Sequence, residues 1–584
     1  LAPAFQNKRN DIENLNAALY LKITLPLGFS IQTTYSPRFE WTNYLFHKAA
    51  ASPDSGSQNG RVDRSQTKDF YWQWDNMLKW NKTFGKHAFD FTFLANWEKF
   101  QRWHDEMTNE NFLPTDELGY GGIGFGTSPN VSSDDVYRTG DAFMGRLHYV
   151  YDQRYLITAT VRRDGYSAFG LANPRATFPA IALGWVFSEE KFLHRPDWFE
   201  YGKLRLSWGK NGNRAVGTYA AFMQLAPRKY IYVDPATGSL VTANTFYAST
   251  MANPNLKWES TTSWNIGTDL TFLKGRLSAN LDVYKKITTD LLVSRELPSL
   301  IGYSSVMSNI GEVQNTGVEL SLNSTNIRMD KLTWRTSFSL AYNKNKITHL
   351  YGIMEDVKDA DGNVIGQREA DDIKNKRFIG HDIDEIWDYK VVGIWQEEER
   401  EEAAKYGQQP GDFHLLDKDM NYKYDNTDKE FQGTTMPRLR WSMRNDFTLF
   451  KNFNISFNMY SYIGHKKTLG RFTNDNALLN VTNQIKRDYW TPENRNNEYP
   501  RLANKKPAGV SYAIYKNASF LRFDNISIGY TFPKKLIEPL RIQNLNVNAT
   551  MKNAGYISGW PGYDPENSDA NTPRVIYFGI NLTL

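Results

Sequence analysis

Apolar and polar residues alternate strictly over residues 141–170, on both sides of a short break at residues 152–154. One face is apolar, with tyrosines near the break, and the other is polar. The apolar face carries Phe143, Leu147, Ile157, Ala159 and Val161, and the polar face carries Arg146, His148, Thr158, Thr160 and Arg162. A period of two residues around a tight turn predicts a β-hairpin. Such a hairpin fits either a soluble sandwich or the wall of a membrane barrel, whose apolar face meets lipid and whose polar face meets a lumen.

The same plan repeats along the chain. Predicted hairpins join residues 16–25 to 28–39, 70–81 to 89–97, 264–272 to 277–283, 439–449 to 454–462 and 526–532 to 545–551. About seventeen strands are expected, most of about 9 to 12 residues, which is the length a tilted strand needs to cross a bilayer. Short turns alternate with long loops throughout, as in membrane barrels. We therefore predict an all-β fold, a transmembrane antiparallel β-barrel in a bacterial outer membrane.

The number of strands carries a second expectation. Short turns of such barrels lie on the periplasmic side, and the predicted last strand runs toward that side, so the C-terminus is expected to be periplasmic. A closed bacterial barrel has an even number of strands. An odd number predicts that residues 1–584 do not close by themselves and form the C-terminal portion of a barrel, with earlier strands missing.

The amino-acid composition excludes several other classes of protein. The 584 residues have a mean hydropathy of −0.58 and no apolar run of the roughly 18 residues that a spanning helix needs, which excludes a helical membrane protein. Aromatic residues make up 14% of the chain, as strands with interfacial belts require. The net charge of +5 gives no reason to expect nucleic acid as a partner. Because there is no cysteine, disulfides, thiolate zinc sites and cysteine nucleophiles are excluded.

Several segments, taken in order, resemble the SusC/RagA-type family of TonB-dependent outer-membrane transporters. They include YLITATVRRDG at residues 155–165, LRLSWG at 204–209, NPNLKWE at 253–259, YWTPEN at 489–494 and GYDPE at 562–566. The resemblance implies a 22-stranded barrel whose lumen is filled by an N-terminal plug, and no plug is visible in this sequence. It also implies active import of a bulky oligosaccharide or oligopeptide, with TonB and a SusD-like surface lipoprotein as partners.

Two alternatives remain at this point. A passive porin or export channel would lack a plug altogether. An outer-membrane hydrolase would need a nucleophile and a base, and no such set stands out among the residues, so we do not expect an enzyme.

Candidate substrate-path residues come from the polar face and from loop aromatics: Arg146, His148, Arg162, Arg163, Asp164, Trp387 and Trp395. For the run at residues 162–164 the preferred interpretation is a network of salt bridges at the base of a loop. The tryptophans could stack on sugar faces, but they serve equally well as packing anchors.

One acidic loop has the spacing of a calcium site. Oxygen-bearing side chains stand at positions 1, 3, 5, 9 and 12 of the loop, at Asp417, Asp419, Asn421, Asp425 and Asp428. Tyr422 replaces the usual glycine, and an aspartate replaces the final glutamate. A solvated acidic loop is the preferred interpretation and bound Ca²⁺ the alternative; no cofactor is otherwise expected.

Two further loop segments have a local pattern. Residues 397–406 begin with acidic residues and precede a glycine, which predicts a short capped helix. Residues 121–126, GGIGFG, follow no buried strand and open no helix, so we expect a flexible outer loop rather than a phosphate-binding one.

Overall fold

The computed structural model describes residues 5–584 except for 53–58, 113–117, 298, 304, 360, 469–487, 503 and 568–569. Eighteen of the described strands belong to one large sheet. No helix in the described part of the chain is both long enough and apolar enough to span a membrane. The chain divides into two compact units, which are taken in turn: unit 1 holds residues 1–185, 206–264 and 287–312, and unit 2 holds the rest.

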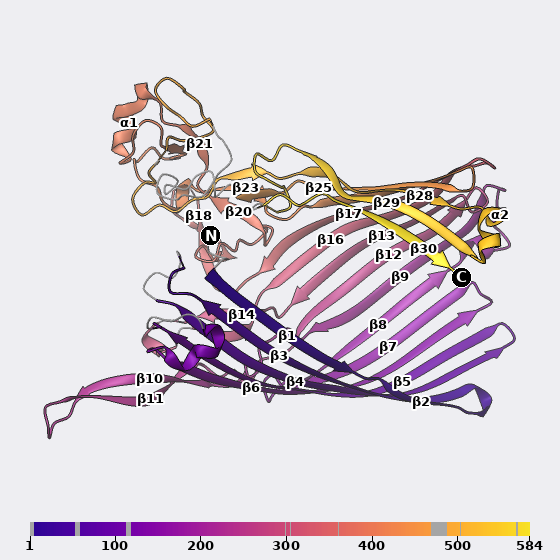
Figure 1. Cartoon of the computed structure of the whole chain (residues 1–584), viewed down its shortest axis with the longest axis horizontal. Coiled ribbons are helices and arrows are strands. Elements are labelled where there is room, and N and C mark those ends of the chain that lie inside the picture. Colours follow the sequence, from indigo (N-terminus) through magenta and orange to yellow (C-terminus); the bar gives the residue numbers. More distant parts are fainter. Residues whose placement is uncertain are drawn as a thin grey trace. The chain divides into compact units, whose positions relative to one another are not determined.

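Unit 1 is built from long antiparallel neighbours (Figure 1). They are β1 (Gln6–Asn16), β2 (Leu19–Thr24), β3 (Phe29–Lys48), β4 (Arg61–Phe84), β5 (His87–Glu110), β6 (Asn130–Tyr151), β7 (Tyr155–Tyr166) and β8 (Arg175–Trp185). Both β1 and β2 pair with β3, with Asn16 opposite Arg38 and Leu19 opposite Tyr35. They are two halves of one interrupted strand, so the eighteen strands occupy seventeen places, as the pattern predicts.

Four strands have residues in both units: β9 (Phe199–Asn213), β12 (Glu259–Phe272), β13 (Leu277–Thr289) and β16 (Glu312–Arg328), of which only the first residue, Glu312, lies in unit 1. Unit 2 continues with the rest of β16, β17 (Leu332–His349), β24 (Leu439–Leu449), β25 (Phe453–Ile463), β28 (Phe520–Thr531), β29 (Asn544–Ser558) and β30 (Val575–Thr583). From β17 to β30 each of these pairs antiparallel with the next. The bounds predicted for β24 are confirmed.

Several strands are longer than predicted. The polar residues 49–68 and the Gly- and Asn-rich residues 108–139 predict loops, yet the first range overlaps the start of β4, and the second overlaps the end of β5 and almost half of β6. The first strand begins at Gln6 rather than at residue 16. These predictions are wrong because a strand that continues past the bilayer keeps its hydrogen-bond ladder but no longer needs an apolar face, so the alternation fades.

The alternation of short turns with long loops has two exceptions. Residues 186–198 and 532–543 stand where short turns were expected. Both connections are longer than residues 167–174, which stand where a long loop was expected. The two long turns contain helical segments, η5 (Phe187–Glu189) and α2 (Lys534–Ile537), that fill the added length. The strict form of the rule is therefore wrong, although the remaining connections follow it.

The apolar face of unit 1 is exposed. Phe143, Ile157 and Val161 are 42–53% exposed, whereas Thr158 and Thr160 between them are half-buried. Two rows of aromatic contacts cross this face, one through Trp80, Phe89 and Tyr149 and one through Trp74, Trp97 and Phe143. On β5, Phe89 and Trp97 are separated by about 26 Å of strand. Because barrel strands are tilted by about 35–45°, this length spans about 20 Å across the membrane, close to the roughly 25 Å apolar band between the aromatic girdles of an outer-membrane barrel.

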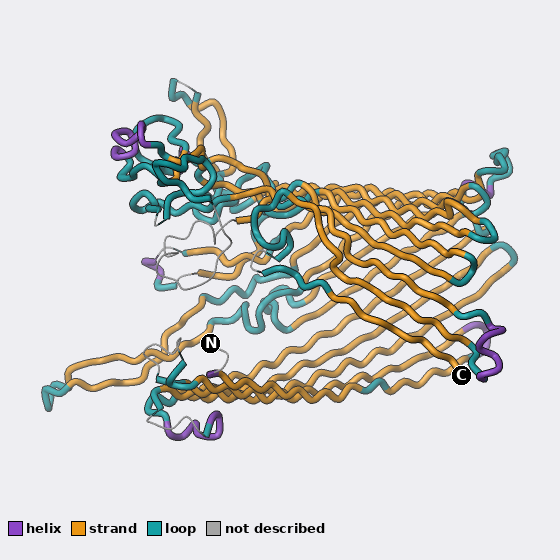
Figure 2. The backbone as a smooth tube through the Cα atoms, turned by 45° about the horizontal axis from the view of Figure 1, so that its top comes forward, coloured by secondary structure: helices purple, strands orange, loops and turns teal. Residues whose placement is uncertain are grey.

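The connections carry small folded pieces of their own, and Figure 2 shows that helices are confined to them. Two-stranded sheets pair β10 (Gln224–Val233) with β11 (Leu240–Thr250), β14 (Leu292–Glu296) with β15 (Ser305–Asn309), and β18 (Met354–Lys358) with β19 (Val364–Glu369). Others pair β20 (Glu385–Asp388) with β23 (Glu430–Thr434), β21 (Val391–Ile394) with β22 (Phe413–Leu415), and β26 (Lys466–Thr468) with β27 (Tyr515–Asn517).

Both loop predictions can now be compared with the structure. The helix predicted at residues 397–406 is confirmed as η7 (Glu397–Glu399) followed by α1 (Arg400–Lys405), with a capping box between Gln396 and Glu399. The glycine-rich run forms the 3₁₀ segment η4 (Gly119–Phe125). The Asn109 side chain donates to the carbonyls of Ile123 and Gly126, 2.8 and 3.0 Å away, so hydrogen bonds hold this segment against β5, and its predicted flexibility stays a prediction.

Candidate functional site

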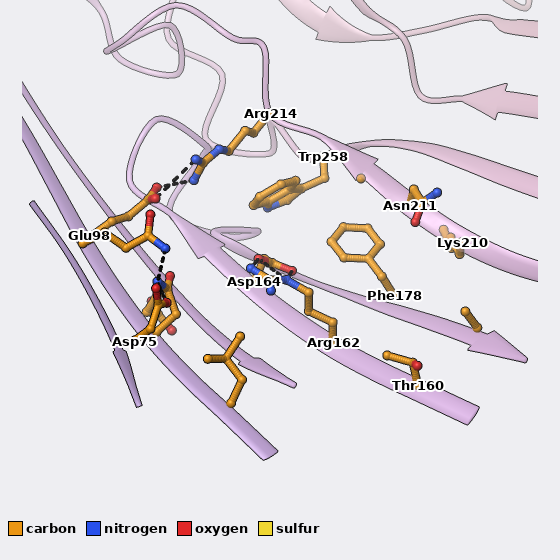
Figure 3. A pocket seen from close by; sticks show the side chains of 16 residues that line it. Asp75, Glu98, Thr160, Arg162, Asp164, Phe178, Lys210, Asn211, Arg214 and Trp258 are labelled. Carbon is orange, nitrogen blue, oxygen red and sulfur yellow. Dashed lines mark hydrogen bonds and ion pairs between the residues drawn. The ribbon is translucent and has the colours of Figure 1, made fainter. Parts of the chain in front are cut away.

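A cavity of about 610 Å³ lies on the polar face of unit 1 (Figure 3). Its wall comes from β4, β5, β6, β7, β8 and the end of β9, and Trp258, just before β12, completes it. On three of these strands every second side chain lines it: Gln73 and Asp75 on β4, Leu94, Asn96 and Glu98 on β5, and Thr160, Arg162 and Asp164 on β7. The period of two that predicts the hairpins therefore also selects the side chains that reach the cavity.

Most charges in this wall are paired. The Arg162 guanidinium donates to Asp164 at 2.9 Å, and Arg175, outside the cavity, donates to Asp141 at 2.8 Å. Arg214, the first residue after β9, forms an ion pair with Glu98 of β5. The network expected at residues 162–164 is thus present between Arg162 and Asp164.

Two charged groups in the lining stand apart from these pairs. The Asp75 carboxylate accepts hydrogen bonds from the neutral amides of Gln73 and Asn96, at 2.8 and 2.7 Å, and has no cation as partner among the described residues. Lys210, near the end of β9, has no ion pair with any residue that the structure describes. The cavity therefore offers one carboxylate and one ammonium group to a ligand.

An aromatic cluster forms the apolar part of the wall. Phe178 and Trp258 line the cavity, and their rings meet edge to face at 5.6 Å, while Phe169 stacks on Trp258 at 4.8 Å. The backbone passes very close behind them, since a Cβ on Gly170 would lie 2.0 Å from the carbonyl oxygen of Pro254. The amide of Gly170 donates to Leu256 at 2.9 Å. Phe169 and Gly170 therefore pack directly against the NPNLKWE segment, and this contact is called the joint behind the cavity.

A second cavity of about 350 Å³ adjoins the first and shares Glu98 and Arg214 with it. Its other lining residues include Tyr71, Phe100 and Arg138. The Arg138 guanidinium lies 4.2 Å from the centre of the Phe100 ring, which is a cation–π contact. The Arg214–Glu98 ion pair is therefore a boundary shared by the two cavities.

The remaining predicted strand residues lie on or near the polar face. His148 shares a 2.8 Å hydrogen bond with Thr158 through Nδ1, and Arg146 is exposed beside the same two strands. Neither lines the cavity of Figure 3. Arg163 lies on the opposite face of β7, next to Val161 in the outward set, so the structure separates it from Arg162 and Asp164.

Trp387 lies on β20 and Trp395 directly after β21, both in the connection between β17 and β24. Trp395 is 2% exposed, stacks on His414 with ring centres 3.5 Å apart, and donates from Nε1 to Gln408. Trp387 is 8% exposed and packs on Phe378. Both rings are therefore covered, which fits packing anchors better than open stacking platforms.

The acidic loop brings three of its five predicted ligands together. One carboxylate oxygen each from Asp417, Asp419 and Asp428 lie within 4.8 Å of one another. Asn421 donates to Asp419, and Asp425 caps the 3₁₀ turn η8 (Asn426–Asp428) that follows it. Chemically, the three carboxylates are the donor set that a hard divalent cation takes.

The same carboxylates are already hydrogen-bonded within the loop. Asp428 is fully buried and accepts from the amides of Lys418 and Asp425, both at 2.9 Å. Asp417 accepts from two amides and from the Tyr406 hydroxyl at 2.9 Å. Burial opposes ionisation of Asp417, but these hydrogen bonds outweigh it and lower its pKa, whereas partial desolvation and the neighbouring Asp417 raise the pKa of Asp419. The loop can thus hold its shape with its own amides.

Sequence reasoning missed most of the cavity. Asp75 and Asn96 belong to alternating strands that the pattern did identify, so their inward direction could have been used. Trp258 lies within the NPNLKWE segment, which carries the family resemblance. Lys210 and Arg214 come from the end of a strand and the start of a long connection, where no periodicity marks them.

The fold and the site together define the class of protein to which this chain belongs. A large antiparallel sheet of seventeen strand places, with an exposed apolar band between aromatic rows and a charged, hollowed polar face, is the wall of an outer-membrane β-barrel.

The comparisons then place the chain more narrowly. Residues 2–554 match the family described as TonB dependent receptor-like, beta-barrel, and the chain belongs to that family. It is 28% identical over 562 residues to TonB-dependent receptor P3 of Formosa agariphila, covering 94% of this chain and 53% of that protein. It is 32% identical over 467 residues to TonB-dependent receptor SusC of Bacteroides thetaiotaomicron, covering 76% of this chain and 43% of SusC. The predicted SusC/RagA-type resemblance is confirmed.

A solved structure shows the same fold. The structure of the RagAB peptide transporter superposes with a TM-score of 0.80 at 19% identity, covering 99% of this chain and 63% of that one. The chain spans about half the length of the curated relatives it matches. The family is one of transport receptors and not of enzymes, which argues against the hydrolase alternative.

Proposed function

We propose that this chain forms part of the barrel of a TonB-dependent importer that takes up a bulky nutrient, an oligosaccharide or an oligopeptide, across the bacterial outer membrane. The single observation that carries the proposal is the family match over residues 2–554. The charged cavity on the polar face supports it. A wall built only to span a membrane has no need of a cavity of this size lined by seven ionisable groups.

Two partners follow from the same proposal. TonB supplies the energy through the rest of the protein, and a SusD-like surface lipoprotein covers the outer mouth. The long connections support such a lid, because they contain a packed core of their own that includes Phe413, Leu415 and Trp490. The proposed orientation places these connections outside the cell and the C-terminus in the periplasm.

The proposal is tested by uptake in the native bacterium. Cells would receive isotope-labelled pools of oligosaccharides and of peptides, in the parent strain, in a strain lacking this protein and in a strain lacking TonB. We expect one pool to enter the parent strain only, and the purified protein to carry a surface lipoprotein. Uptake that needs this protein but not TonB would instead establish the passive porin.

Bound Ca²⁺ in the acidic loop stays the alternative to a solvated loop without a cation. It is supported by the three converging carboxylates and opposed by the amides that already satisfy two of them.

A further inference from the structure

We propose that the 610 Å³ cavity binds a zwitterionic ligand with an apolar body, the chemistry of an oligopeptide with free termini, and that Asp75 takes its ammonium group and Lys210 its carboxylate. This inference rests on the proposed import function and narrows its substrate class. It starts from the charges of the cavity wall.

The wall contains four carboxylates and three cationic groups. Three of the carboxylates are engaged by arginines: Asp164 by Arg162, Glu98 by Arg214 and Asp141 by Arg175. Asp75 and Lys210 are the two ionised lining groups left without an opposite charge among the described residues. Because the paired groups already neutralise one another, a ligand meets one negative and one positive centre.

The state of Asp75 suits an incoming cation. Gln73 and Asn96 each donate one hydrogen bond to it, at 2.8 and 2.7 Å, and so fix both oxygens in place. A carboxylate has about four acceptor positions, so capacity remains for an ammonium group. Neutral amide donors orient the carboxylate without cancelling its charge, as a site preorganised for a cation requires.

Lys210 supplies the complementary group from another strand. Asp75 lies on β4 and Lys210 on β9, and in Figure 3 they stand at opposite sides of the cavity with Phe178 and Trp258 drawn between them. Two opposite charges separated by an apolar wall match a ligand with charged ends and an apolar middle.

The apolar part of the wall is held in a fixed shape. Phe178 lies in the cluster around Trp258, and Gly212 leaves room for its ring, since a Cβ there would lie 2.1 Å from the Phe178 Cζ. A neutral oligosaccharide could contact these rings but would leave Asp75 and Lys210 without counter-charges. Desolvating two unpaired charges opposes its binding, so the wall discriminates in favour of the zwitterion.

The experiment compares defined ligand pools on the purified full-length protein. Tetrapeptide pools of equal composition carry free termini, an acetylated N-terminus or an amidated C-terminus, and a malto-oligosaccharide pool serves as the neutral comparison. Retained ligands are quantified by mass spectrometry. We expect the free-termini pool to be enriched about tenfold over each capped pool, the ratio that one charge pair of about 1.4 kcal/mol gives.

Two variants separate recognition from folding. Asp75→Asn should abolish discrimination against the acetylated pool only, and Lys210→Gln should abolish discrimination against the amidated pool only. Asp69→Asn is the matched control on β4, because that carboxylate is held by Arg102 and lies outside the cavity lining; it should leave both preferences intact.

The inference is overturned if capped and free peptides are retained equally, if no peptide is retained, if oligosaccharides are preferred, or if the variants lower all pools alike. If TonB-dependent uptake persists together with any of these results, the proposed import function is retained and only the proposed zwitterionic ligand is rejected.

Discussion

The guanidinium of Arg522 donates a 2.5 Å hydrogen bond to the carboxylate of Asp564, and the two side chains are only 3% and 1% exposed. Arg522 lies on β28, and Asp564 lies in the connection after β29, within the GYDPE segment of residues 562–566. Arg522 also donates to Asn553 of β29. This buried pair therefore fastens a connection to the strands beneath it.

Replacing Arg522 by alanine should destabilise the folded protein by about 3–5 kcal/mol, because it leaves a buried carboxylate without its partner. The measurement is the temperature at which the folded barrel loses its compact migration on a gel. Arg9→Ala breaks a solvent-exposed pair with Asp11 and is the control, with little change expected. Equal midpoints for the two variants would contradict the structural role given to Arg522.

The same carboxylate predicts an acid response. Burial alone would raise the pKa of Asp564, but hydrogen bonds from Thr572 and the Glu566 amide, and the charge of Arg522, lower it below its usual range. A lowered pKa in the folded state contributes stability above the unfolded pKa of about 3.9, and this stability is lost as the pH falls through the folded value. We expect the connection after β29 to become protease-sensitive below about pH 4. In Asp564→Asn this connection should be equally sensitive at pH 7 and well below pH 4; a retained acid response would assign it to another group.

Gly170→Ala should open the joint behind the cavity. The added Cβ would lie 2.0 Å from the carbonyl oxygen of Pro254, so the backbone must shift, at about 1–3 kcal/mol. Gly145→Ala on β6 is the matched control, because nothing lies within 4 Å of its Cβ position. Thermal midpoints of the two variants test this, and an unchanged Gly170→Ala protein would show that the joint is looser than described.

The acidic loop should keep its conformation without a cation. Its buried Asp428 and its Asp417 are satisfied by loop amides and by Tyr406, so we expect calorimetric titration with Ca²⁺ to give no saturable heat that depends on these residues. Saturable binding that Asp417→Asn and Asp419→Asn abolish would establish the calcium alternative.

The alternation of apolar and polar residues identified the strands well where they cross the bilayer. At β24 and β25 apolar and polar residues alternate, and the predicted bounds agree with the structure to within one residue. At β1, with the sequence QNKRNDIENLN, neither face is apolar, and only pairing with β3 makes it a strand. Pairing energy of that kind leaves no mark on a single sequence.

The site was less predictable for a related reason. Arg162 and Asp164 could be identified from their place on an alternating strand. Arg214 reaches Glu98 across 116 residues of sequence, and such a contact depends on how β5 and β9 are brought together rather than on local spacing. The tryptophans illustrate the opposite case, because composition alone cannot tell a buried Trp395 from an exposed one.

The central claim is that alternate residues of these strands face lipid and a water-filled lumen. Cysteine labelling tests it directly, because the 584 residues contain no cysteine. In cells carrying the full-length protein, Thr160→Cys lines the cavity and should react with a membrane-impermeant, water-soluble maleimide, whereas its neighbour Val161→Cys should stay protected by lipid until detergent is added. Equal labelling of the two positions in intact cells, or labelling of position 161 alone, would contradict the assignment of this sheet to the wall of an outer-membrane barrel.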